Sequence, residues 1–164
     1  MLPQGKWFIN GKDLYSTFGI IIESGTDGFL KWPDAKEGIS RNYRDANGID
    51  IDLSKIFFNF KEITLRCIIL ADSEDAFWSL RNGFMAEWAK GGYTRIQVTE
   101  FGNRSYYCYY KNMSDFTRFT PIRIEESGDI KVACKFTLNI VEGEPNLDNL
   151  ATFIVDEQGR HLIT

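Results

Sequence analysis

The sequence predicts a β-rich α+β protein, an antiparallel split barrel or compact sandwich with one flanking amphipathic helix at about residues 73–90. Along most of the chain, apolar and polar residues alternate with the period of half-buried strands. A single segment, Ser73–Lys90, repeats its apolar residues at helical spacing instead. Aromatic residues make up 15% of the 164 residues, a richness that favours strands and excludes a disordered chain.

The first third of the chain alternates short strand patterns with turns. Trp7–Tyr15 predicts a hairpin, because Asn10 and Gly11 suit the positive φ angles of a type I′ turn. Ile20–Ile22 predicts a short strand, and Phe29–Pro33 predicts a second extended stretch after a glycine-rich break. The polar segment Asp34–Gly48 predicts a long mobile loop, which in compact domains is usually functional or disordered.

Two strand patterns lead into the helix. Gly48–Ser54 alternates apolar with acidic residues, which is typical of an exposed or edge strand. Glu62–Leu70 alternates strictly at first and becomes apolar on both faces at its end, where we expect the helix to cover it.

Residues at both ends of the predicted helix indicate where it begins and where it ends. Ser73 can cap the first turn, and Gly91 supplies a left-handed exit. Glu74 and Asp75 place negative charge at the positive end of the helix dipole. The apolar stripe consists of Phe77, Leu80, Phe84 and Trp88, with Ala76 and Met85 beside it and Arg81, Asn82 and Glu87 mostly elsewhere. This one-sided stripe predicts packing against a sheet.

The strands after the helix are predicted from alternation alone. The expected segments are Thr94–Thr99, Ser105–Tyr110, Phe116–Ile124 with an interruption at Pro121, and Ile130–Ile140. We expect residues 1–143 to form one domain. Residues 144–164 then form a C-terminal extension, in which Phe153–Val155 and His161–Ile163 predict a terminal hairpin.

Composition excludes several classes of protein. The formal net charge of −4 disfavours a general nucleic-acid or anionic-membrane binder. The first residues do not have the pattern of a signal peptide, and no apolar run is long enough for a transmembrane span. The three cysteines, Cys67, Cys108 and Cys134, lie in strand patterns without metal-ligand spacing, so we expect buried free thiols.

The order of five segments resembles a known family. The segments are Phe8–Leu14, Phe18–Ser24, Gly28–Pro33, Gly48–Ser54 and Phe60–Cys67, followed by one helix and further strands. Together they resemble the N-terminal, ring-forming domain of distal tail proteins from long-tailed bacteriophages and prophages, within the tail-tube-like superfamily. The resemblance covers roughly Trp7–Glu142. Many family members continue into a larger C-terminal domain, whereas here about twenty residues follow.

The resemblance implies a virion structural protein. It implies a homo-oligomeric ring at the tail tube, possibly a hexamer, that contacts neighbouring tail proteins and binds no membrane and no specific nucleic-acid sequence. It also implies that the protein resides in the bacterial cytoplasm during assembly and then in the virion tail. Head-to-tail association closes sheet edges into a ring where the rotation permits.

Candidate subunit contacts come from the loop, the acidic strand and the exposed aromatic residues. They are Phe29, Trp32, Arg41, Tyr43, Arg44, Asp50, Asp52, Tyr107 and Tyr109. Tyr107 and Tyr109 alternate with Tyr106 and Cys108, so the two pairs face opposite sides of a strand. Exposed aromatic rows also stack sugars, which leaves a monomeric carbohydrate- or peptide-binding module as an alternative.

The sequence does not favour an enzyme. Its one histidine, His161, lies in the tail, away from any candidate nucleophile. Asp50 and Asp52 share one face of the predicted strand, which leaves a carboxylate enzyme as a remote alternative. We expect no catalytic residues, no metal and no cofactor.

Overall fold

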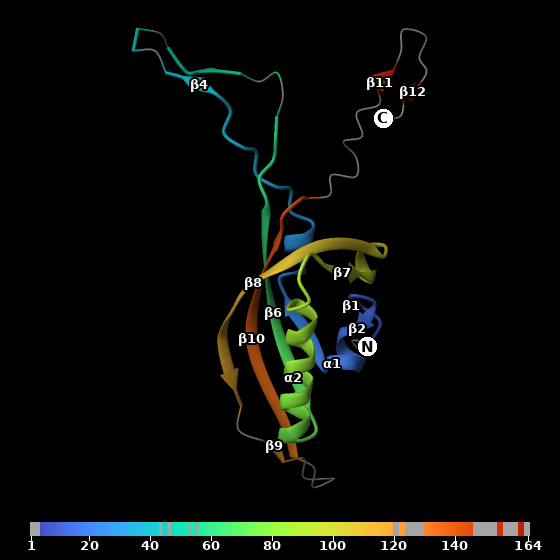
Figure 1. The fold of residues 1–164 in the computed structure, drawn as a ribbon. Helices are drawn as coiled ribbons and strands as arrows, with labels where there is room; N and C mark the ends of the chain where they lie inside the picture. The colour runs from blue at the N-terminus through green and yellow to red at the C-terminus, as the bar shows by residue number, and fades with distance from the viewer. Residues whose placement is uncertain are drawn as a thin grey trace.

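A single open antiparallel sheet with one long helix on one face forms the body of the protein. The computed structural model describes residues 4–42, 44–45, 47–52, 54, 56–119, 122–123, 130–145, 154–155 and 161–162. Seven strands follow the order β2-β1-β7-β8-β10-β6-β3, and β9 pairs with β10 (Figure 1). The predicted β-rich architecture with one main helix is confirmed, and the sheet does not close into a barrel.

The elements have these bounds: β1 Trp7–Ile9, β2 Lys12–Asp13, α1 Leu14–Phe18, β3 Ile20–Ser24, η1 (a 3-10 helix) Thr26–Phe29, β4 Ser40–Arg41, β5 Asp50–Ile51, β6 Lys61–Ala71, α2 Glu74–Trp88, β7 Thr94–Val98, η2 Thr99–Phe101, β8 Arg104–Arg118, β9 Ile122–Arg123, β10 Ile130–Glu142, β11 Ile154–Val155 and β12 His161–Leu162. The last two pair antiparallel with each other. The division at residue 143 remains a prediction.

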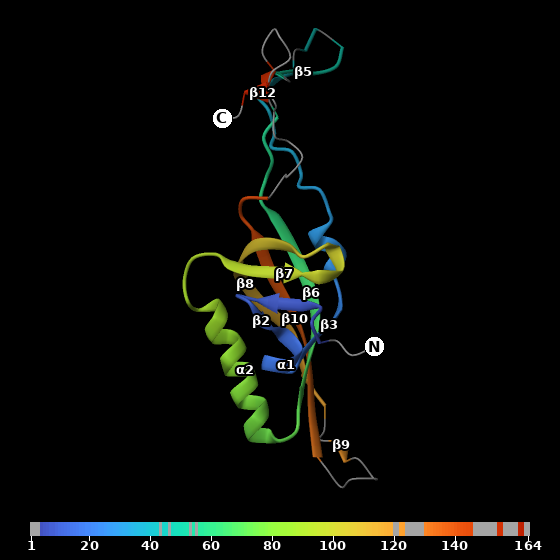
Figure 2. The same cartoon turned by 90° about the vertical axis from the view of Figure 1, so that its right-hand side faces the viewer.

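The strands β6 and β10 form the centre of the sheet and were predicted correctly. They pair antiparallel over eleven residue pairs, with Leu65 opposite Leu138. Alternate residues of β6 are buried from Lys61 to Ala71, because one face of the sheet is covered by α2 while the other faces outward (Figure 2).

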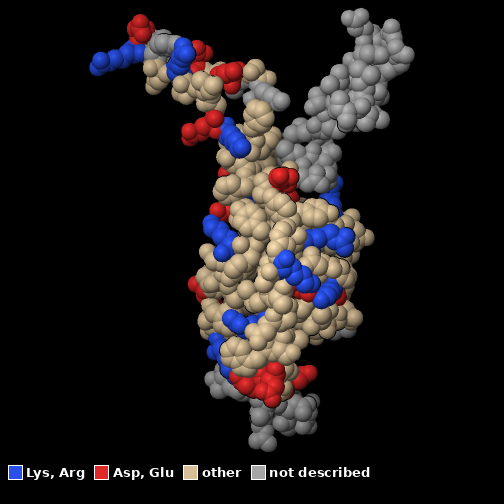
Figure 3. All heavy atoms as spheres, in the orientation of Figure 1, with Lys and Arg blue, Asp and Glu red and all other residues tan. Residues whose placement is uncertain are grey.

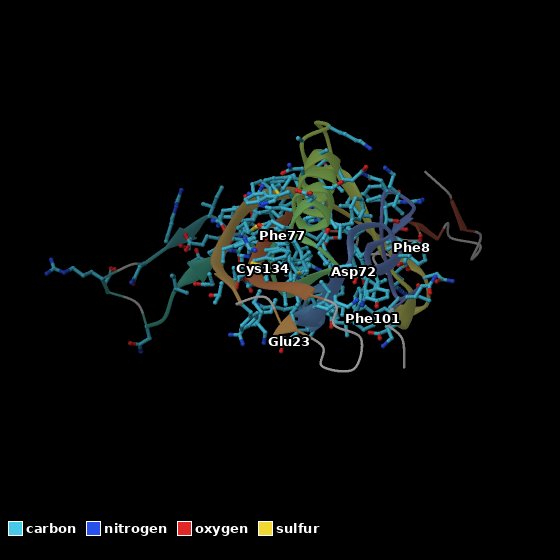
Figure 4. All side chains as sticks on the ribbon, turned by 90° about the horizontal axis from the view of Figure 1, so that it is seen from below. Phe8, Glu23, Asp72, Phe77, Phe101 and Cys134 are labelled. Carbon is cyan, nitrogen blue, oxygen red and sulfur yellow. The ribbon has the colours of Figure 1, made fainter. Side chains whose placement is uncertain are left out.

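The helix α2 begins where the sequence predicted. The Ser73 side chain accepts a hydrogen bond from the Ala76 amide at 3.1 Å, and Gly91 has a positive φ of 79° beyond the last turn. Phe77 and Phe84 of its stripe are buried at 1% and 2% exposure. Seen end-on, Phe77 lies between the helix and the sheet (Figure 4).

Glu87 corrects the predicted helix surface, because it is buried at 3% exposure instead of facing solvent. Its carboxylate accepts hydrogen bonds from Asn10 Nδ2 at 3.0 Å, Lys12 Nζ at 2.6 Å and Lys90 Nζ at 2.7 Å. These bonds, that from Asn10 first, lower the pKa of Glu87 to about 2. The carboxylate thus ties the end of α2 to the turn between β1 and β2.

The N-terminal hairpin has the predicted turn. Asn10 and Gly11 have φ angles of 49° and 82°, and Ile9 pairs with Lys12. The strand does not continue to Tyr15 as expected. Asp13 accepts a hydrogen bond from the Ser16 amide at 2.7 Å and caps the short helix α1 instead.

The strand β8 is longer than predicted. It runs through Phe116 to Arg118, so the expected separate strand Phe116–Ile124 is replaced by the end of β8 and the short β9. Its pairing with β10 shifts register twice, and Asp115 has a positive φ of 52°. Such bulges interrupt alternation without ending a strand, which explains the wrong boundary.

Residues 25–60 differ most from the prediction. Phe29 does not begin an extended stretch, because it ends the 3-10 helix η1 after Gly25, whose φ is 98°. The expected long loop and edge strand form an antiparallel ladder outside the main sheet. Among its described residues, Ser40–Arg41 and Asp50–Ile51 are the strands.

Candidate interaction surface

A long two-stranded arm, residues 30–60, projects from one end of the body (Figures 1 and 4). At its root the Lys36 amide donates to the Phe57 carbonyl at 2.7 Å, and the Asn59 amide donates to the Asp34 carbonyl at 2.8 Å. Farther out, the Asp52 amide donates to Ile39 at 3.1 Å. The arm is therefore an ordered backbone ladder over its described residues.

Apolar side chains are unusually exposed on the arm. Fifteen large apolar side chains are exposed in the described part of the chain, and eight of them belong to the arm. The eight are Leu30, Trp32, Ile39, Ile49, Ile51, Ile56, Phe57 and Phe60, with exposures from 40% to 80%. An isolated two-stranded hairpin is marginally stable in water, and exposed apolar clusters of this kind mark interaction sites.

The two strands of the arm carry different charges. Figure 3 shows basic and acidic side chains along the arm among its uncharged residues. The outgoing side, residues 30–44, holds Lys31, Lys36, Arg41 and Arg44 against Asp34 and Glu37. The described residues of the returning side, residues 45–60, include Asp45, Asp50 and Asp52 and no basic residue. The arm is thus basic on one strand and acidic on the other.

Asp50 lies in the strand β5, whereas Asp52 lies directly beyond its end. The strand β5 ends at Ile51, and the Asp52 carboxylate accepts a hydrogen bond from the Ser54 amide at 2.9 Å. Hydrogen bonds from Ser54 lower the pKa of Asp52. Asp50 makes no ion pair with any residue that the structure describes.

A pocket of about 310 Å³ opens at the root of the arm; we call it the root pocket. It is lined by aromatic and basic side chains, chiefly Trp32, Phe101, Tyr106, Lys31, Lys61 and Arg104. These residues come from the start of the arm, β6, η2 and β8, so the pocket lies where the arm joins the body.

A buried ion pair holds the wall of the root pocket. Lys61 Nζ lies 2.9 Å from the Glu142 carboxylate, with side-chain exposures of 8% and 2%. The same ammonium group donates to the Phe29 carbonyl at 2.9 Å and lies 5.7 Å from the centre of the Tyr106 ring. A buried pair needs such additional partners, because desolvation opposes it. It fixes the first residue of β6 to the last residue of β10.

Most of the predicted subunit-contact residues are exposed, but they do not form one surface. Trp32, Arg41, Arg44, Asp50 and Asp52 are exposed on the arm. Tyr107 and Tyr109 lie on β8, on the face away from the core, with exposures of 52% and 43%. Tyr43 lies outside the described residues.

Phe29 is a correction to the predicted contact set. It is 3% exposed, and its ring centre lies 4.7 Å from that of Tyr106. The turn of η1 rotates it into the core, so Phe29 supports the pocket wall from inside the body.

Sequence reasoning missed Tyr93, which extends the exposed tyrosine row. Tyr93 is 50% exposed, and its ring centre lies 6.3 Å from that of Tyr109. The available signal was an isolated aromatic residue directly after Gly91 and Gly92, which carries no periodicity. Tyr93, Tyr107 and Tyr109 therefore form a second candidate surface.

Metal-ligating side chains do not gather in the described part of the chain. Over the described residues, no group of three or more His, Cys, Asp or Glu side chains could hold a metal ion. The described part of the chain also contains no helix that is long and apolar enough to cross a membrane. The three cysteines are buried free thiols, as predicted.

Comparisons with known proteins give a clear structural likeness. No protein-family model matches the chain, and no curated protein matches it. Among solved structures, the chain is similar to the Dit protein (gp 19.1) of phage SPP1, described as a paradigm of the hub adsorption apparatus in phages that infect Gram-positive bacteria. The TM-score is 0.60 at 17% identity.

The likeness covers 85% of this chain and 50% of the SPP1 protein, so the chain spans half the length of that hub protein. At this identity the likeness concerns the fold. It agrees with the phage tail-like fold that the sequence resemblance predicted.

Proposed function

We propose that this protein is a structural component of a phage or prophage tail that assembles with copies of itself into a ring at the tail tube. The fold shared with a phage hub protein supports the setting. The observation that carries self-assembly is the arm, which exposes eight large apolar side chains away from the body. In a monomer this apolar surface is exposed to water, which is unfavourable. Contact with a partner would bury the surface and gain that free energy.

The shape of the molecule favours a head-to-tail arrangement. The arm lies at one end of an elongated body, so an arm that reaches a neighbouring copy contacts a different surface there (Figure 2). Such a heterologous contact makes a closed ring when the rotation between copies closes. Six copies is the number that the family resemblance suggests, and neighbouring tail proteins would occupy the two faces of the ring.

The expected contact is large. Lasting assemblies bury on the order of 2,000 Å² or more per interface, and an exposed arm can supply such an area together with the surface that receives it. The protein would assemble in the bacterial cytoplasm and then reside in the virion tail. No reacting group is involved in this role.

Negative-stain electron microscopy and light scattering of the purified protein test the proposal. We expect ring-shaped particles of uniform diameter at tens of micromolar protein, with a mass that is a whole multiple of the monomer. A monodisperse monomer over this concentration range would overturn it.

A second candidate function is favoured by the paired rings of Tyr93 and Tyr109, which resemble a stacking platform for a sugar. In this case the protein is a monomeric carbohydrate- or peptide-binding module. Binding on a glycan array that Tyr109→Ala abolishes would support it, whereas a Tyr109→Ala variant that binds like the wild type would exclude the platform.

A further inference from the structure

The root pocket has an excess of positive charge in a chain that is acidic as a whole. Three of its lining side chains, Lys31, Lys61 and Arg104, are cationic. Lys61 is balanced by the buried carboxylate of Glu142, whereas Lys31 makes no ion pair with any described residue. The net charge of the whole chain is −4. The pocket is therefore suited to an anionic group that also has apolar surface.

The arm carries a segment with that chemistry. In Ile49–Asp52 the apolar and acidic residues alternate, so an extended backbone turns two isoleucines to one side and two carboxylates to the other. Ile49 and Ile51 are 59% and 40% exposed, and both aspartates are exposed. The segment thus presents one apolar edge and one acidic edge to solvent.

The segment and the pocket do not meet within one molecule. The arm projects away from the body (Figure 1), and β5 lies far out along it (Figure 2), whereas the residues of the root pocket lie where the arm joins the body. Ten residues separate Leu30 from Ser40, which is enough extended chain to reach roughly 33–36 Å. This reach is comparable to the width of a domain of this size, whose radius of gyration is about 14 Å. The tip of one arm can therefore reach the root of another copy.

We infer that residues Ile49–Asp52 of one copy bind in the root pocket of the next copy. Ile49 and Ile51 pack against Trp32, Phe101 and Tyr106, and the two carboxylates lie toward Lys31 and Arg104. This inference rests on the proposed self-assembly, and it names both halves of the contact. Each copy donates one arm and offers one pocket, which makes the contact directional.

Paired charge reversals test the contact. An arm variant, Asp50→Lys with Asp52→Lys, and a pocket variant, Lys31→Glu, each place like charges together. We expect each to weaken association by on the order of 10- to 100-fold in sedimentation velocity across a protein dilution series. Matched controls are Asp45→Lys on the same arm strand and Lys36→Glu on the other strand. Each control changes the charge by two units outside the contact, as one reversal does within it, and we expect wild-type association.

Recombining the charges is the decisive step. A single chain that carries all three reversals restores opposite charges between the arm and position 31 and should assemble again. An equimolar mixture of the arm variant and the pocket variant should also assemble, because each arm then meets the opposite charge at position 31. Circular dichroism and urea unfolding of every variant confirm that the body remains folded.

The outcomes separate the two proposals. If the wild-type protein assembles and the reversals behave like the controls, the arm–pocket contact is wrong and the proposed ring stands. If the recombined variants do not recover assembly, the charges do not face each other and the contact is wrong. If the wild-type protein is monomeric at all concentrations, the proposed function itself fails.

Discussion

The body of this protein buries its large apolar side chains, whereas the arm exposes them to solvent. In the body, β6 and β10 are strands of eleven and thirteen residues, and core residues on them such as Ile69 and Ile140 are fully buried. In the arm, two strands of two residues each hold Ile39 at 80% exposure. The body is complete as a folded unit, whereas the arm has apolar surface without a covering layer.

This difference assigns separate tasks to the two regions. Burial of apolar area stabilises the body by roughly 25 cal/mol per Å², and the same free energy is still available to the arm for association. Substitutions in the body should therefore change folding, and substitutions in the arm should change assembly. Each prediction below compares a body residue with an arm residue or an exposed group.

The largest expected effect separates a buried aromatic residue from an exposed arm residue. Phe77→Ala removes a ring that is 1% exposed and should lower the free energy of unfolding by about 3–5 kcal/mol. Ile39→Ala, at 80% exposure, should change it by less than about 0.5 kcal/mol. Urea unfolding at one dilute protein concentration measures both. An arm variant as destabilising as the core variant would contradict the comparison.

Two glycines with positive φ give the next contrast. A Cβ atom at Gly25 would lie 2.0 Å from the Thr64 carbonyl oxygen, whereas at Gly48 in the arm it would meet nothing within 4 Å. Gly25→Ala should therefore lower the free energy of unfolding by roughly 2–4 kcal/mol, from backbone strain plus displacement of β6. Gly48→Ala strains only the arm and should leave the unfolding curve of the body unchanged.

The buried carboxylate Glu87 should make the stability of the body depend on pH. Its pKa is about 2 in the folded protein and 4.5 ordinarily, so its contribution is fully present above about pH 4.5 and is lost as the pH falls toward 2. Glu87→Gln should lower the free energy of unfolding by about 1–3 kcal/mol at pH 7 and by progressively less in acid. Urea unfolding between pH 7 and pH 2 measures the difference.

The matched control for Glu87 is Glu62→Gln, which removes an exposed ion pair with Lys111. It should cost less than about 1 kcal/mol at pH 7. If the two variants lower the free energy of unfolding equally, the contact of Glu87 between α2 and the hairpin stabilises the protein no more than an exposed ion pair does.

The smallest effect concerns the cysteines of the body. Burial raises the pKa of Cys67 and of Cys108 to about 12, so both thiols remain protonated at pH 8 and react slowly. Iodoacetamide should label the native protein slowly and the urea-unfolded protein rapidly, as followed by mass spectrometry. A cysteine introduced at the exposed arm residue Ile39 should label at once. Rapid native labelling of Cys67 would contradict the buried core.

The alternation of apolar and polar residues predicted the central strands, because it reflects the face of the strand on which each successive residue lies. Burial alternates along β6 from Lys61 to Ala71 and along β10 from Cys134 to Ile140, so the pattern is visible in the sequence. The boundary of β8 was missed because its bulges break the period while β10 continues to pair with it. The burial of Glu87 was missed because its partner Lys12 lies 75 residues away.

The arm was predicted only in part, for a physical reason. Polar and charged residues between Asp34 and Gly48 indicate a long loop and a place for contacts. Whether a loop lies on the body or projects from it depends on contacts that are distant in sequence, such as the isolated bridge from Ala35 to Phe58. Phe29 was misassigned for the same reason, because the turn after Gly25 decides its direction.

Sedimentation velocity of an arm-trimmed protein tests the central claim most directly. The root ladder allows residues 37–56 to be replaced by Asn-Gly, because the Lys36 amide already donates to the Phe57 carbonyl at 2.7 Å and Asn-Gly closes two-residue hairpins. The account predicts that the wild-type protein sediments as a uniform multimer and the trimmed protein as a folded monomer with a cooperative urea transition. A trimmed protein that assembles like the wild type would contradict it.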